Sequence, residues 1–296
     1  MKISGPAGRY RLAAHFVSGA AAEGQSGELF VDDPTTMPPV KADLAIWGKD
    51  EGLEKWLKEH GIAFHAVAAG QPLQKRETIL VVGKAAENAE QFKDLASRMT
   101  RGSTVVFLTL QTLVDDALPD KEKGAHLCWL PLANKGRLAE TDSLIRPEIP
   151  EGWINGLYHR DDWVRRHPLF EGLPAGGLMD WTFYRTIAPV GGKCLMGSDT
   201  PDEAVCGGIN TCCGYLSGLY LGVWKLGAGR FIANGLNIRD NLGSDPVAER
   251  LLRNMLKYAG QNLDKPLADL PADFDKQLET MGYKAGQTDT KGVSSL

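Results

Sequence analysis

The chain has 296 residues, of which 43% are hydrophobic and 24% are charged, a balance that excludes a disordered or fibrous protein. The formal net charge of -4 gives no electrostatic reason to expect nucleic acid or an anionic membrane as a partner. No apolar run reaches the ~18 residues of a membrane span and no signal peptide is present, so we expect a cytoplasmic chain as given, or a periplasmic or extracellular one if a longer parent carries a signal.

Two short strands are predicted first, at 10–17 and 28–31, joined by a turn-rich stretch that suits a hairpin. An isolated hairpin is marginal in water, so this segment, residues 1–33, needs a further sheet to join. Three prolines then fall in residues 34–41. Because proline fixes φ and removes a donor, we predict an extended linker and a domain boundary there.

From residue 42 the pattern changes to short apolar runs that alternate with helical spacing. Strands are predicted at 43–47, 62–67, 78–82 and 103–108. Helices are predicted from Leu53 to His60, ended by Gly61, and over 88–99. Continuously apolar strands between helices are typical of a parallel sheet covered on both faces, so residues 42–260 are predicted to form an α/β domain.

After residue 130 the later strands look antiparallel, and they are predicted at 193–196, 204–206, 215–224 and 230–235. Asp245 and Pro246 are predicted to begin a strong helix, as N-cap and first-turn residue. The remainder, 261–296, is a polar C-terminal tail with a short helix at 272–281 and an end that we expect to be disordered.

The charged stretch between His159 and His167 lies in a region that is predicted to hold broken helices and loops. On a helix, Asp161 would pair with Arg165, and Asp162 with Arg166, at the (i, i+4) spacing of surface ion pairs. The alternative is a metal or ligand site in which His159 converges with these aspartates. We favour the ion pairs, and we expect no metal and no cofactor.

The five cysteines form no C-x-x-C pair, which argues against a disulfide framework and a zinc site; they are Cys128, Cys194, Cys206, Cys212 and Cys213. We expect reduced, mostly buried thiols. The turn after the third predicted parallel strand, where such folds can hold a nucleophile, reads Gly83-Lys84-Ala85 and offers neither Cys nor Ser. Phosphate-binding glycine motifs are also absent.

Two segments carry the side chains expected of a ligand site. The first holds Asp180, Trp181, Tyr184 and Arg185. These residues suit a sugar-binding site, because aromatic faces stack on sugar C–H groups while charged side chains bind hydroxyls. The alternative is that Trp181 and Tyr184 pack in the core and Asp180 pairs with Arg185. The second segment follows a strand and precedes the Asp245 helix, and its candidate residues are Asn237 and Arg239.

Several of these motifs resemble a known module. They are His167–Pro174, Met179-Asp180-Trp181 with Tyr184, Gly227–Arg230 and Asp245–Leu252. The chain resembles the amidotransferase-like module at the C-terminal end of bacterial glycoside hydrolase family two proteins, which are β-galactosidase-like. The likeness implies a flavodoxin-like parallel sheet of the class I glutamine amidotransferase type, with antiparallel additions. It also implies that the N-terminal β-hairpin is the edge or remnant of a preceding β-sandwich.

The resemblance does not imply catalysis. The amidotransferase triad needs G-x-C-x-G and His-x-Glu, and neither pattern occurs in the chain. Our first hypothesis is a non-catalytic accessory or oligomerisation module that binds carbohydrate, with a second copy of the chain or a preceding catalytic domain as partner. The alternatives are a hydrolase that uses Cys212 or Cys213 with His159 or His167 as base, and a glycosidase-associated enzyme completed at a subunit interface.

Overall fold

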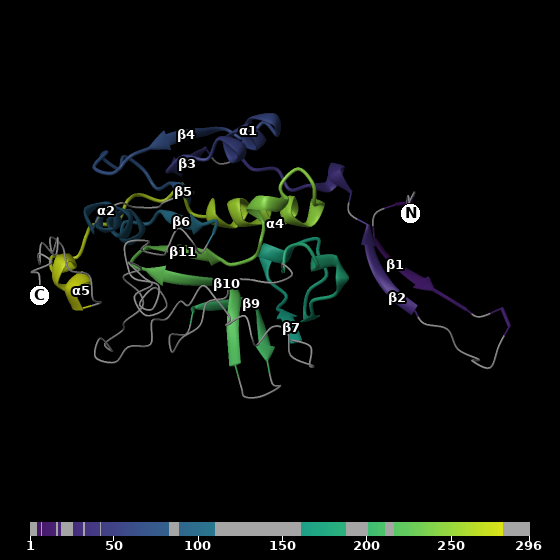
Figure 1. Ribbon diagram of the computed structural model, residues 1–296. Helices are drawn as coiled ribbons and strands as arrows, with labels where there is room; N and C mark the ends of the chain where they lie inside the picture. The colour runs from purple at the N-terminus through teal and green to yellow at the C-terminus, as the bar shows by residue number, and fades with distance from the viewer. Residues whose placement is uncertain are drawn as a thin grey trace, which may run out of the picture.

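The computed structural model describes residues 5–6, 8–15, 17–18, 26–31, 33–41, 43–82, 89–109, 161–187, 201–210 and 216–280. Within them the chain forms a nine-stranded mixed sheet and a separate antiparallel pair at the N-terminus (Figure 1). The α/β class, the antiparallel strands and the N-terminal β-hairpin are thus confirmed. No helix in these ranges is both long and apolar enough to span a bilayer.

The nine strands lie in the order β4-β3-β5-β6-β11-β10-β9-β7-β8. Five are mutually parallel: β4 (Phe64–Val67), β3 (Leu44–Trp47), β5 (Thr78–Val81), β6 (Thr104–Phe107) and β11 (Gly229–Asn234). Each of the other four is antiparallel to its neighbours: β10 (Leu216–Leu226), β9 (Glu203–Asn210), β7 (Asp161–Val164) and β8 (Gly177–Leu178). The predicted parallel sheet is therefore one half of a larger mixed sheet.

Strand residues alternate between two cores, one on each face of the sheet. In β3, Leu44 and Ile46 join the core that contains residues of α1 (Glu51–Glu59) and α4 (Pro246–Ala259). Ala45 and Trp47 join the core of α2 (Ala89–Thr100) and α5 (Phe274–Thr280). Because both faces are buried, the strands read as unbroken apolar runs. Phe274 and Leu278 of α5 are buried, so the C-terminal segment contributes to the second core.

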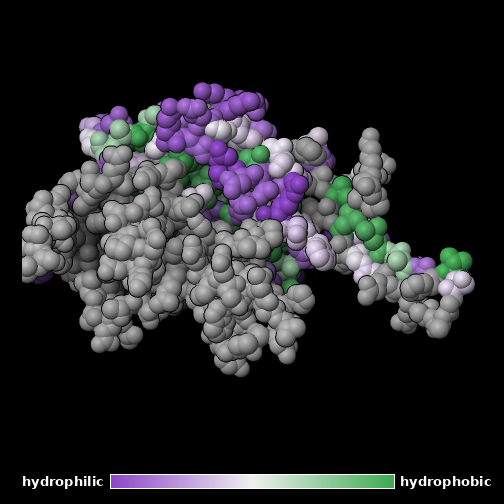
Figure 2. Space-filling model, in the orientation of Figure 1, coloured by the Kyte–Doolittle hydropathy of each residue, from purple (hydrophilic) through white to green (hydrophobic). Residues whose placement is uncertain are grey.

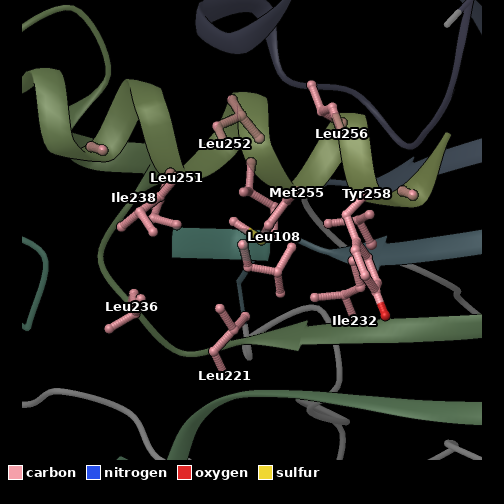
Figure 3. Packing of buried hydrophobic residues seen from close by; sticks show 14 of the residues in the cluster. Leu108, Leu221, Ile232, Leu236, Ile238, Leu251, Leu252, Met255, Leu256 and Tyr258 are labelled. Atoms are coloured by element: carbon pink, nitrogen blue, oxygen red, sulfur yellow. The ribbon is translucent and has the colours of Figure 1, made fainter. Parts of the chain in front are cut away.

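The helix α4 packs along the centre of the sheet. It begins as the sequence predicts, because the Asp245 side chain accepts a hydrogen bond from the Val247 N–H at 3.1 Å and Pro246 occupies the first turn. Figure 3 shows the inward side chains of α4, which are Leu251, Leu252, Met255 and Leu256. They pack against side chains of the sheet, which include Leu108, Leu221 and Ile232. Each such buried side chain stabilises the fold by roughly 1.5–3 kcal/mol.

The N-terminal hairpin, β1 (Gly8–Ala13) and β2 (Ser26–Val31), projects from the main sheet (Figure 1). Its base is connected to the domain by a 3-10 turn, η1 (Pro34–Thr36), so the prediction of an extended linker is wrong at this point. The Asp33 side chain accepts hydrogen bonds from the N–H and hydroxyl of Thr35, at 2.8 and 2.7 Å. These bonds, with the fixed φ of Pro34, favour a turn over extended backbone.

Residues 161–164 form the strand β7, so the (i, i+4) ion pairs that we favoured for a helix at this point are wrong. β7 pairs with β9 on one side and β8 on the other, which places Val164 in the core. Sheet pairing and burial of Val164 outweigh the ion pairs that a helix would gain, which are worth only ~0.2–0.5 kcal/mol each. The Asp162 side chain accepts a hydrogen bond from the Tyr220 hydroxyl at 2.6 Å, and His159 lies outside the described residues.

Candidate functional site

Trp181 and Tyr184, together called the aromatic platform, occupy the 3-10 turn η4 (Trp181–Phe183) and its C-cap. The turn starts at Asp180, whose side chain accepts a hydrogen bond from the Thr182 N–H at 2.9 Å. Phe183 is fully buried and its ring lies 5.6 Å from that of Phe170, centroid to centroid. The buried ring anchors the turn, so the two platform rings are held at the surface.

The platform faces solvent. Trp181 is 77% exposed and Tyr184 is 56% exposed, and their ring centroids lie 5.9 Å apart with planes inclined by 36°. The alternative that both rings pack in the core is therefore wrong. Asp180 caps η4, whereas Arg185 donates to the Ser244 carbonyl oxygen at 3.0 Å. These two hydrogen bonds replace the ion pair between Asp180 and Arg185 that the alternative predicted. The buried aromatic of this segment is Phe183.

The fold brings the two segments predicted to bind a ligand side by side. The Asn237 N–H donates to the Thr186 carbonyl oxygen at 2.8 Å. The Asn241 side-chain amide then donates to the carbonyl oxygens of Arg185 and Asn237, at 3.2 and 2.7 Å. These bonds hold the loop after β11 against the segment after η4, so Arg185 and Asn237 belong to one continuous surface with the platform.

Arg239 has a different role from the other candidates. Its guanidinium forms a two-point ion pair with Asp50, with both nitrogen–oxygen distances at 2.5 Å. Asp50 also caps α1 by accepting from the Leu53 N–H at 3.0 Å, and these hydrogen bonds, led by that of Arg239, hold the pKa of Asp50 below its ordinary value. Gly52 leaves the room that the guanidinium needs, because a Cβ there would lie 2.5 Å from Nη2. Arg239 thus fastens the loop after β11 to α1.

In open parallel sheets, ligands bind beyond the carboxyl ends of the strands at the point where the strand order reverses. Here that point lies between β3 and β5, and the ends of these two strands are closely packed. Gly48 follows β3 at φ +99°, and a Cβ on it would lie 2.1 Å from the Val82 carbonyl oxygen. A side chain at this position would therefore force the two strand ends apart. The predicted strand-to-helix turn, Gly83-Lys84-Ala85, lies outside the described residues.

Within the described residues, Cys206 is fully buried, and burial followed by the charge of Asp162 raises its thiol pKa well above the ordinary value. A thiol in this state is a poor nucleophile. The other four cysteines, Cys212 and Cys213 among them, lie outside the described residues, as does the predicted strand at 193–196. The described ranges contain no group of three His, Cys, Asp or Glu side chains arranged to hold a metal ion.

His167 is engaged through both ring nitrogens. Its Nδ1 accepts from the Leu169 N–H at 3.2 Å, which places the ring proton on Nε2, and Nε2 donates to Glu203 at 2.7 Å. The Tyr258 hydroxyl donates to the same carboxylate at 2.7 Å. Burial opposes ionisation of Glu203, but the hydrogen bonds from His167 and Tyr258 outweigh it and lower the pKa of the carboxyl. Burial and the bond to Glu203 raise the pKa of Tyr258 to about 12.

This cluster joins the start of η3 (Pro168–Phe170), the start of β9 and the end of α4. A catalytic base needs a ring nitrogen that reaches the substrate, and here each ring nitrogen already has a protein partner. The arrangement therefore serves the fold. Sequence reasoning identified His167 but not Glu203 or Tyr258, because 36 residues separate His167 from Glu203 and 55 separate Glu203 from Tyr258, with no local motif to connect them.

No protein-family model and no curated protein matches the sequence. Among solved structures, a cytoplasmic protein from Salmonella typhimurium is 11% identical with a TM-score of 0.41, and the match covers 84% of this chain and 95% of that one. A β-galactosidase from Bacillus circulans sp. alkalophilus is 13% identical with a TM-score of 0.41, over 80% of this chain and 33% of the galactosidase. Both similarities are too distant to assign a family or an activity.

Proposed function

We propose that the chain is a non-catalytic accessory module that binds carbohydrate at the aromatic platform. The observation that carries the proposal is the pair of neighbouring rings, 77% and 56% exposed, held on a turn that a buried Phe183 anchors. Exposing two large aromatic side chains forfeits the hydrophobic stabilisation of their burial. A sugar that stacks on both rings recovers part of it, and two rings suit an oligosaccharide better than a single sugar unit.

Polar side chains beside the rings complete the proposed sugar site. Arg185 is exposed and its guanidinium is steadied by the Ser244 carbonyl, while Asn237 lies on the adjoining loop with its backbone fixed to Thr186. Guanidinium and amide groups bind sugar hydroxyls as directed donors and acceptors. Asp180 contributes indirectly by capping η4.

The wider proposal is an accessory role beside β-galactosidase-like glycoside hydrolases, supported by the sequence motifs His167–Pro174 and Met179-Asp180-Trp181. We also propose that the parallel half of the sheet is flavodoxin-like. Its strands, numbered by their order in the chain, run 2-1-3-4-5 across the sheet from β4 to β11, which is the flavodoxin order. Neither part of this proposal assigns catalysis.

A thermal-shift screen of the full chain against neutral oligosaccharides tests the sugar site. We expect stabilisation without turnover, abolished by Trp181→Ala and reduced by Tyr184→Ala. Leu178→Ala is the matched control, because Leu178 is 69% exposed and lies three positions before Trp181 but has no ring to stack on a sugar. Equal loss in all three variants would show that stacking on the two rings is not what binds the sugar, and hydrolysis of any glycoside would overturn the non-catalytic assignment.

A second candidate function is oligomerisation through the hairpin. In the β1–β2 register, Tyr10 faces Leu29 and Gly8 faces Val31, which places the apolar residues Tyr10, Leu12, Leu29 and Val31 on one face. Leu12 is 48% exposed, and Figure 2 shows apolar residues gathered on the projecting hairpin. The partner proposed for this face is a second copy of the chain, with a preceding domain of a longer protein as the alternative.

A further inference from the structure

The loop between β11 and α4, residues 235–245, holds Arg185 at both of its ends. The Asn241 side-chain amide donates to the Arg185 backbone carbonyl oxygen at 3.2 Å, and the Arg185 guanidinium donates to the Ser244 carbonyl oxygen at 3.0 Å. Arg185 is an exposed residue, and an arginine held only by its backbone samples many rotamers. The two contacts limit where its guanidinium lies beside the aromatic platform.

Asn241 is the residue through which most hydrogen bonds of this loop run. Its side-chain amide also donates to the Asn237 carbonyl oxygen at 2.7 Å. Its own carbonyl oxygen accepts from the Ser244 N–H at 3.1 Å, the Ser244 hydroxyl at 3.2 Å and the Asp245 N–H at 2.9 Å. The peptide group between Ser244 and Asp245 is therefore held at its N–H by Asn241, while its carbonyl oxygen holds Arg185.

Two further contacts fasten the same loop to two helices. Arg239 pairs with Asp50 at the start of α1, and the Gly243 N–H donates to the Glu249 carboxylate of α4 at 3.2 Å. The loop is therefore a fixed frame, and Arg185 is oriented by a part of the structure that does not have to rearrange when a ligand binds. Preorganisation of this kind lowers the entropic cost of binding.

We propose that Asn241 is a positioning residue of the sugar site and that it sets the specificity of the site through Arg185. This role rests on the proposed sugar site. Aromatic faces stack on sugars of many kinds, whereas a guanidinium has N–H groups in fixed directions and binds hydroxyls that lie along them. The platform then supplies most of the affinity, and the guanidinium selects the sugar by the orientation of a hydroxyl.

Two pairs of neutral disaccharides test this role, because the members of each pair differ only in the orientation of one hydroxyl: lactose with cellobiose, and melibiose with isomaltose. Titration calorimetry of the full parent chain should show about tenfold tighter binding of one member in at least one pair, the effect of one hydrogen bond to a charged group. Asn241→Ala should weaken the preferred member about tenfold and the other member little, so that the selectivity is lost.

A double-mutant cycle separates positioning from a general effect on the fold. Arg185→Ala should remove the same selectivity. Asn241→Ala in the Arg185→Ala background should weaken binding no further, because Asn241 acts through Arg185. Asn241→Ala leaves the hydrogen bonds of the Asn241 backbone carbonyl possible, and Asn241→Ser, which also lacks the amide donors, takes its place in the cycle if the alanine variant does not fold.

Gln277→Ala is the matched control, because the Gln277 side-chain amide also makes a surface hydrogen bond, to Asp273 at 2.8 Å, but lies on α5 outside the sugar site. It should keep the affinity and the selectivity of the parent chain, and the melting temperature of each ligand-free variant reports whether it folds. Equal affinity for both members of each pair in the parent chain would overturn the role of Asn241 and leave the sugar site standing. Equal weakening of both members by Asn241→Ala, or further weakening in the double variant, would do the same. Absence of binding of all four disaccharides would contradict the sugar site, and with it the role of Asn241.

Discussion

Glu203 accepts hydrogen bonds from two side chains that belong to different elements, His167 and Tyr258. Replacing it by Gln keeps the shape and removes the charge. At neutral pH we expect Glu203→Gln to lower the free energy of unfolding by about 1.5–3 kcal/mol, the range for hydrogen bonds to a charged group. Urea unfolding of the parent chain and the variant measures this difference.

The same difference should depend on pH in a defined direction. The folded-state pKa of Glu203 lies below its ordinary value, so its contribution is complete above the ordinary pKa and is lost as the pH falls through the folded-state pKa. The gap between parent and variant should therefore shrink on going from neutral pH to about pH 3. A gap that stays constant would mean that the carboxylate charge is not what stabilises the cluster.

Some residues of the candidate site were predictable and others were not. Trp181 and Tyr184 stand out in the sequence as aromatic residues among charged ones, but composition does not reveal which ring of this segment is buried. The structure buries Phe183 and exposes Trp181 and Tyr184, because a 3-10 turn has three residues per turn, which places Trp181 and Tyr184 on one face and Phe183 on another. Arg239 looked equally suited to a ligand, and its ion pair with Asp50 spans 189 residues. No local pattern predicts such a pair.

At the scale of elements, the turn between β10 and β11 depends on close packing as well as on backbone conformation. Gly227 has φ +58° and a Cβ on it would lie 2.7 Å from the Thr100 carbonyl oxygen, whereas Gly243 has φ +79° with open space around it. We expect Gly243→Ala to cost only the left-handed strain, about 1–2 kcal/mol. Gly227→Ala should cost clearly more, because the α2 backbone must also move.

Denaturant unfolding of both glycine variants measures the comparison directly. Equal costs would show that the turn does not need the contact with Thr100. A larger cost for Gly243→Ala would contradict the packing of this turn against the end of α2 altogether.

Most elements of the α/β domain could be predicted, because period-2 and helical apolar patterns match buried faces within the segment itself. The strands β3, β5 and β6 and the helix α4 lie within a few residues of their predicted bounds. β7 was missed for two reasons. Its pairing partners, β8 and β9, come later in the sequence, and the charged residues around Trp163 have the spacing of a helix surface. The 3-10 turn η1 was missed because one capping side chain, Asp33, decides it.

At the scale of the whole molecule, the projecting hairpin predicts self-association. Light scattering after gel filtration of the full chain should give a mass of at least two chains, each of 32.1 kDa. Leu12→Asp places a charge on the apolar face of the hairpin and should shift the protein to the monomer, since burying an unpaired charge at an interface is costly. Arg11→Gln, on the opposite face of the same strand, is the control, because it changes the charge of that face without placing a second acid across from Glu28. A monomeric parent chain would exclude the second copy as partner.

We expect the aromatic platform to stack directly on a bound sugar. Saturation-transfer difference NMR of the full chain with a bound oligosaccharide tests it most directly, because the signal identifies which sugar protons lie against the protein. We predict strong transfer from the parent chain to the C–H protons of the sugar rings. In Trp181→Ala this transfer should be lost, while the variant keeps the melting temperature of the parent chain. Unchanged transfer in Trp181→Ala would contradict the assignment. So would the absence of transfer from the parent chain to every neutral oligosaccharide of the thermal-shift screen.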